Sequence, residues 1–167
     1  MRSALIDGMV LAVAPMHLLA IVAIGLLAGQ GGRGGFVLAL FALGMFAGSL
    51  AIASAIRETP SALVLLAVSA FAGIMVAAAI MLPSILTNVL AFATGVALAL
   101  DTPPRAIGIA AAIASQIGTG AAAIAVLMLV MLIATGADRP WQRIGLRVAC
   151  SWIAASAILA LTLRLAR

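Results

Sequence analysis

Six long apolar runs follow one another along this 167-residue chain, and they restrict its fold more than any other feature. They cover about residues 4–29, 36–56, 60–82, 84–101, 104–135 and 141–165, and the short breaks between them are rich in charge, glycine and proline. A helix that crosses a bilayer needs roughly 20 apolar residues. No run alternates with a two-residue period. The sequence therefore predicts an all-α fold, a single polytopic transmembrane bundle of six helices with both termini on one side.

The composition excludes most soluble functions. Apolar residues make up 66% of the chain and charged residues only 8%, whereas a soluble domain carries about a quarter charged residues. All nine basic residues are arginines, and they are spread singly along the chain, between the apolar runs or near their ends, the pattern of headgroup and topology anchors. We therefore expect the lipid bilayer as partner and no nucleic acid, despite the net charge of +5.

The sequence bears on whether the chain has a cleaved signal peptide and a disulfide. Ala12-Val13-Ala14 has the small-x-small form of a signal-peptide cleavage site. Asp7 interrupts the apolar core of such a signal, and Pro15 would follow the cut, so we expect a retained first span. Cys150 is the only cysteine, which excludes an intrachain disulfide.

The fifth run is too long for a straight perpendicular span. Its 32 residues would form a helix of about 48 Å, against a hydrocarbon core of about 30 Å. Gly118-Thr119-Gly120 lies within it and predicts a bend there. Elsewhere, pairs of glycines four residues apart, Gly25 with Gly29 and Gly44 with Gly48, predict close helix packing within the bundle.

Polar residues form a stripe in the fourth run. Thr87, Thr94 and Asp101 are spaced by seven, which places them on one helix face, and Asn88 and Gly95 lie beside them. Polar groups within a membrane are costly and often functional, so the stripe is a candidate polar path. Two alternatives stay open: the residues only form interhelical hydrogen bonds, or Asp101 only caps its helix.

His17 is the only histidine, and it lies within the first apolar run. A neutral imidazole is a good metal ligand and proton carrier, although a single histidine also fits a hydrogen-bonded structural role. We predict that His17 faces the stripe, with Thr94 as the nearer partner because Asp101 ends its run. Gln116 and Thr119, in the fifth run, extend the candidate path.

No catalytic motif is present in the sequence. It holds neither the Gly-x-Ser-x-Gly turn of a serine hydrolase nor the His-Glu-x-x-His motif of a zinc protease. We therefore expect that the protein is not an enzyme and has no resident cofactor.

Two stretches of the chain resemble a known family. Residues 10–33 read VLAVAPMHLLAIVAIGLLAGQGGR, and residues 92–103 read FATGVALALDTP. Both are similar to motif regions of the hydrogenase/urease accessory membrane proteins, the HupE/UreJ family, which carries H-P-x-x-G-x-D-H in its first span and H-G-x-A-H-G-x-E-x-P in a later one. The order of six spans and the length also fit, so the resemblance covers nearly the whole chain.

The resemblance can be followed residue by residue. In the first motif only the last histidine is kept, as His17, and the other positions hold Val10, Ala14 and Met16. The second motif keeps its first glycine, an alanine and the proline, with aspartate in place of glutamate, whereas its two histidines are replaced. The residues kept are Gly95, Ala97 and Pro103. Asp101 is the aspartate, and Thr94 and Leu98 stand at the two histidine positions. A further histidine of the family aligns near Thr119.

The resemblance implies a function in nickel handling. It suggests a permease for Ni²⁺ or a related divalent cation such as Co²⁺, or an accessory to urease or hydrogenase maturation, in a bacterial inner membrane. His17 and Asp101 are the candidate metal ligands that remain. Because few donors are left, we expect only weak and transient metal binding. The alternative is a non-transporting scaffold or accessory subunit that kept the fold, lost the ligands, and binds a membrane-protein partner or a second copy of itself.

Overall fold

The protein is a bundle of helices. The computed structural model describes residues 2–12, 14–31, 34–53, 61–103 and 109–166. In these ranges it has no strand and seven helices, which confirms the all-α prediction but exceeds the predicted six by one. They are α1 (Arg2–Ala12), α2 (Pro15–Gln30), α3 (Gly34–Ala53), α4 (Ser61–Ala77), α5 (Ser84–Asp101), α6 (Ile109–Thr135) and α7 (Pro140–Leu165).

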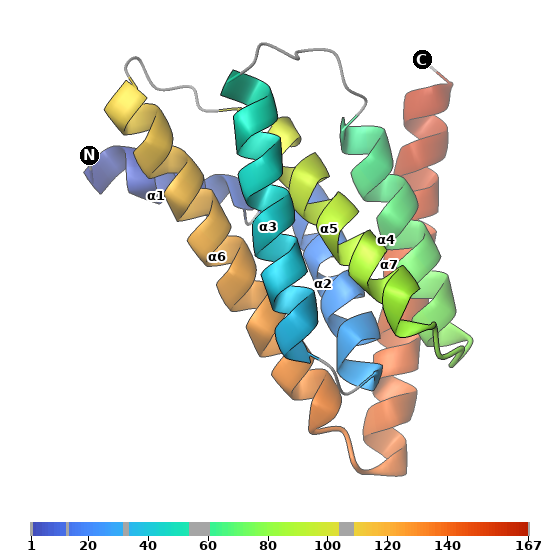
Figure 1. Cartoon of the computed structure of the whole chain (residues 1–167). Helices are drawn as coiled ribbons and strands as arrows, with labels where there is room; N and C mark the ends of the chain where they lie inside the picture. The colour runs from blue at the N-terminus through green and yellow to red at the C-terminus, as the bar shows by residue number, and fades with distance from the viewer. Residues whose placement is uncertain (1, 13, 32–33, 54–60, 104–108, 167) are drawn as a thin grey trace.

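Helices α2 to α7 alternate in direction, and α1 lies across the bundle beside α6 (Figure 1). At one end α2, α4 and α6 begin and α3, α5 and α7 end; we call this the His17 end. The opposite end, where α7 begins, is the Arg143 end. The first and last helices of the chain both reach the His17 end of the bundle (Figure 1).

Several helices have the length and composition to cross a membrane. Four of those described do so alone, namely α3, α5, α6 and α7, and α1 with α2 would count as a fifth. Helix α4 is apolar but has only 17 residues. Large apolar side chains cover the outside, with Ile109 82% and Trp152 71% exposed. Such a surface fits the surroundings of an integral membrane protein, in which lipid contacts the apolar exterior.

The first apolar run does not form the single span predicted over residues 4–29. Helices α1 and α2 meet at an angle of 64°. Pro15 is the first residue of α2. Its nitrogen carries no hydrogen, and its ring would clash with the carbonyl of Leu11 in a continuous helix. Helix α1 therefore ends before Pro15, and α2 begins there in a new direction.

The predicted bend in the fifth run is wrong. Helix α6 continues unbroken through Gly118–Gly120 and lies obliquely in the bundle (Figure 1). The glycine serves close packing instead, because a Cβ on Gly118 would overlap the Leu5 carbonyl oxygen of α1. In return, a Cβ on Gly8 of α1 would overlap the Ser115 carbonyl oxygen of α6. At this crossing the two backbones are in direct contact.

The other predicted spans agree with the structure to within a few residues, except for the end of the third. The α5 prediction of 84–101 is confirmed. Helix α4 stops at Ala77 rather than 82, because Ala79 adopts a left-handed φ of 56° and the Ile80 N–H returns to the Met75 carbonyl at 3.0 Å. The second run's last residues, 54–56, the expected start of α4 at Pro60 and the start of the fifth run, 104–108, lie outside the described residues.

The paired glycines do pack helices within the bundle, as predicted. A Cβ on Gly29 of α2 would overlap the Ala134 side chain of α6. A Cβ on Gly44 of α3 would overlap the Phe92 carbonyl of α5, and Gly95 of α5 fits against the Phe41 carbonyl of α3 in the same way. These contacts replace the hydrophobic driving force that lipid surroundings remove.

The bundle predicts the result of a labelling experiment. In a Cys150→Ala background, Ser3→Cys and Ala166→Cys should react with an impermeant maleimide added to the same side of sealed vesicles, because α1 and α7 both reach the His17 end. Asp138→Cys, between α6 and α7, should react only from the opposite side. Labelling of positions 3 and 166 from opposite sides would contradict this arrangement of the helices.

Candidate functional site

The imidazole of His17 lies at the centre of a polar cluster at the His17 end. Its side chain is 5% exposed, and both ring nitrogens have a partner. Nδ1 is 2.7 Å from the Leu11 carbonyl oxygen, and Nε2 is 2.8 Å from Oδ2 of Asp101. The cluster therefore joins the start of α2 to the end of α5.

Pro15 explains why the Leu11 carbonyl is available. In a continuous helix this carbonyl would accept the N–H of the residue four positions on, which is Pro15 and has no N–H. The Ala14 N–H reaches the carbonyl at 3.1 Å, and the His17 ring provides a second donor. The helix break that the sequence prediction missed is thus what orients the imidazole.

Asp101 receives a second hydrogen bond from a third helix. Its Oδ1 accepts from the Ser61 hydroxyl at 3.1 Å, so the carboxylate connects α2, α4 and α5. The alternating directions of the helices bring the start of α4 and the end of α5 together. That alternation was the only sequence signal for Ser61, and the sequence prediction missed this residue and the Leu11 carbonyl.

The geometry fixes how many protons the pair holds. Both ring nitrogens face oxygen acceptors, the Leu11 carbonyl and the Asp101 carboxyl. Two hydrogen bonds therefore require either an imidazolium beside a carboxylate or a neutral Nδ1–H imidazole beside a protonated carboxyl. In both forms the pair is neutral overall and holds one proton between Nε2 and Oδ2.

The structure corrects the partner predicted for His17. Spans 1 and 4 are neighbours as predicted, since α2 contacts α5. However, Thr94 is not the partner, because its hydroxyl donates to the Leu90 carbonyl of its own helix at 2.6 Å. The break at Pro15 places His17 in the first turn of α2, at the level of Asp101, rather than about 10 Å deeper at the level of Thr94.

The remaining stripe residues are not brought together with the pair. Thr87 and Asn88 lie in the first turns of α5, at the Arg143 end, and about 20 Å of helix separates Thr87 from Asp101. Gly95 packs against the α3 backbone. The stripe thus runs the length of α5 but gathers at no single site.

Gln116 and Thr119 of α6 lie near the His17 end and have structural partners. The Gln116 amide donates to the Thr102 carbonyl, next to Asp101, at 3.3 Å, and its Oε1 is buried without a partner among the described residues. The Thr119 hydroxyl donates to the Gly8 carbonyl of α1 at 3.0 Å. Gln116 therefore borders the cluster, while Thr119 fastens α1 to α6.

Between the His17–Asp101 pair and the Arg143 end, the bundle is filled with apolar side chains. Ile21, Ile24, Phe41 and Leu98 are all fully buried and belong to one hydrophobic cluster. This packing separates His17 and Asp101 from Thr87 at the other end of α5. In the conformation described, the polar residues form separate sites rather than a connected path.

The cluster offers only a few donors to a metal ion. They are Nε2 of His17, the two carboxylate oxygens of Asp101 and the Ser61 hydroxyl. No group of three or more His, Cys, Asp or Glu side chains suited to a metal occurs in the part of the chain that the structure describes. Arg164, whose Nη2 lies 3.3 Å from Sδ of Met16, is close enough to act electrostatically on the Asp101 carboxylate. Its positive charge weakens the attraction for a cation.

The cluster is thus a buried histidine–carboxylate pair that connects α2 and α5, and Nε2 of His17 can bind another group only if the shared proton leaves. No family model, curated protein sequence or solved structure matches this chain.

Proposed function

We propose that this protein is a bacterial inner-membrane protein similar to the HupE/UreJ family, and that it passes a divalent cation such as Ni²⁺ or Co²⁺ in support of urease or hydrogenase maturation. The observation that carries the proposal is the 2.8 Å contact between Nε2 of His17 and Oδ2 of Asp101. These are two of the positions where the resemblance places metal ligands. They are 84 residues apart in the sequence and in contact in the folded chain.

The orientation of the imidazole supports this proposal. Metal-binding histidines commonly donate one ring N–H to a backbone carbonyl, which fixes the tautomer and directs the other nitrogen at the metal. The bond from Nδ1 of His17 to the Leu11 carbonyl has this form. A cation that replaced the shared proton would find a nitrogen and a carboxylate oxygen side by side, and both donor types suit Ni²⁺.

The second candidate is a non-transporting scaffold or accessory subunit. The tightly packed apolar layer of Ile21, Ile24 and Leu98 favours it, because it leaves no polar route through the bundle in this conformation. In that case the pair stabilises the junction of α2, α4 and α5. The protein would then act through a membrane-protein partner or a second copy of itself.

Metal titration separates the two candidates. Calorimetry on the detergent-purified protein should give a Ni²⁺ dissociation constant of roughly 10 µM or weaker, since the site supplies few donors and must release a proton. Asp101→Asn, which keeps the shape of the side chain, should abolish the binding. Ser49→Ala provides a control, because the Ser49 hydroxyl donates within its own helix, to the Met45 carbonyl.

Three results would decide against parts of this account. A sub-micromolar Ni²⁺ constant would mean that more ligands take part than His17, Asp101 and Ser61. Equal heats for the wild type and Asp101→Asn would remove the pair from the site. No heat at all, with a partner protein co-purifying in fixed ratio, would favour the scaffold.

A further inference from the structure

We propose that the cavity at the Arg143 end binds the phosphate group of a phospholipid headgroup through Arg143 and Arg147. This site lies at the opposite end of the bundle from His17 and Asp101. It does not depend on the function proposed above.

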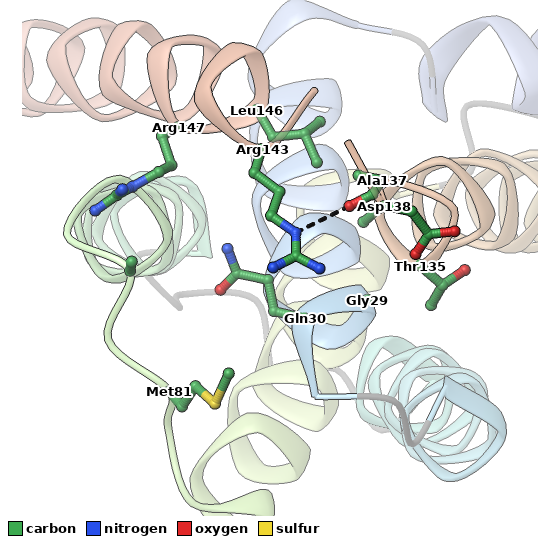
Figure 2. Close-up of a pocket in the computed structure, with 11 residues that line it drawn as sticks. Gly29, Gln30, Met81, Thr135, Ala137, Asp138, Arg143, Leu146 and Arg147 are labelled. Carbon is green, nitrogen blue, oxygen red and sulfur yellow. Dashed lines mark hydrogen bonds between the residues drawn. The ribbon is translucent and has the colours of Figure 1, made fainter. Parts of the chain in front are cut away.

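The cavity lies where several chain segments meet. It has a volume of about 420 Å³ and is bordered by the last residues of α2 and α6, the first turns of α7 and the segment that follows α4. Both arginines extend from α7 and line the cavity; Figure 2 shows Arg143 directed at Gln30 and Arg147 directed away from Arg143. The half-buried Gln30 amide adds a neutral donor to the same space.

Each arginine is held by one hydrogen bond and keeps most of its donors. Nε of Arg143 donates to the Ala137 carbonyl at 3.1 Å, and Nε of Arg147 donates to the Ala77 carbonyl at 3.1 Å. A guanidinium has five N–H groups, so four remain on each side chain. Within the described residues neither has another hydrogen-bond partner. Two oriented guanidinium groups with free N–H groups match the oxygen atoms of a phosphate.

The depth of the cavity favours a lipid over a free anion. Helix α7 has 26 residues and is about 39 Å long, so it exceeds the hydrocarbon core and its first turns reach the headgroups. Trp141, in the first turn, is 64% exposed, as expected of an aromatic residue at the membrane interface. Met81, on the cavity wall, is 81% exposed and can contact an acyl chain. Basic pockets between helices at this depth are suited to lipid headgroups.

The third charged residue of the cavity limits the charge that it attracts. Asp138 also lines the space, so the two arginines and the aspartate together carry +1. This matches a phosphodiester, which carries one negative charge. Asp138 also supplies a test, because its removal should strengthen binding of an anionic lipid.

The experiment measures the melting temperature of the full chain in detergent with added dioctanoyl phosphatidylglycerol. At a concentration ten times the dissociation constant, we expect a rise of about 3–5 °C. Dioctanoylglycerol, which lacks the phosphate, should give no rise. Arg143→Gln/Arg147→Gln should weaken binding at least about tenfold, whereas Asp138→Asn should strengthen it roughly threefold.

Arg139→Gln is the control, because it removes one positive charge from the same helix start at a residue outside the cavity lining. It should change the affinity less than about twofold. Each variant is compared with its own unliganded melting temperature, and if the double variant does not fold, Asp138→Asn decides. An equal loss in Arg139→Gln, an equal rise with dioctanoylglycerol, or weaker binding in Asp138→Asn would overturn the proposal. An equal rise with inorganic phosphate at the same concentration would show a site for free anions and would contradict the binding of a lipid.

Discussion

Replacing Asp101 with alanine should lower the free energy of unfolding by about 2–3 kcal/mol. The change leaves Nε2 of His17 and the Ser61 hydroxyl without their acceptor. Removal of one member of a fully buried pair typically costs about 3–5 kcal/mol, and the 19% exposure of the carboxylate reduces that loss. Unfolding in mixed detergent with increasing dodecyl sulfate, followed by circular dichroism, measures the difference.

The double variant His17→Leu/Asp101→Leu separates a polar contribution from packing. Apolar replacement of both partners leaves no unpaired group, so most of the lost stability should return. A double-mutant cycle should give a coupling free energy of at least about 1 kcal/mol between the two positions. A coupling near zero would mean that the 2.8 Å contact contributes nothing to folding.

Gly118→Ala should be the other strongly destabilising change, by about 2–3 kcal/mol. The added Cβ would overlap the Leu5 carbonyl oxygen, and a backbone atom of a packed helix cannot move aside cheaply. Because Thr119 fastens α1 to α6 at the same crossing, separation of the helices would also strain its bond to the Gly8 carbonyl.

Gly120→Ala is a close control two residues away on the same helix. Its Cβ would meet only the Met45 methyl, at 3.8 Å, an ordinary contact. Alanine is the better helix former by about 1 kcal/mol, so this variant should be at least as stable as the wild type. If both alanine variants unfold alike, α1 does not pack on α6 as described.

Most run lengths and helix ends could be predicted from the sequence, because they depend on local chemistry. Apolar runs and proline-rich breaks are local signals, and the bounds of α5, Ser84–Asp101, followed from them. The glycines of α6 were harder to interpret. A glycine within a helix permits either a bend or a close approach, and only the position of Leu5 in the folded chain decides between them.

The candidate site was predicted in part for a similar reason. Polarity singled out His17 and Asp101, and the structure brings them together. Their depth could not be derived while residues 4–29 were read as one helix, so Thr94 was the wrong partner. Pro15 was the available signal: a proline eleven residues into an apolar run frees a carbonyl and lets the chain turn.

The most direct test of the central claim is Ni²⁺ uptake into proteoliposomes that contain a chelating fluorophore. The wild type should show slow, saturable uptake above that of protein-free liposomes. His17→Asn, which keeps a polar side chain, should reduce the uptake at least about tenfold while its melting temperature stays within a few degrees of the wild type. Uptake by the wild type no faster than by protein-free liposomes, or unchanged uptake in His17→Asn, would contradict a cation site at the His17–Asp101 pair.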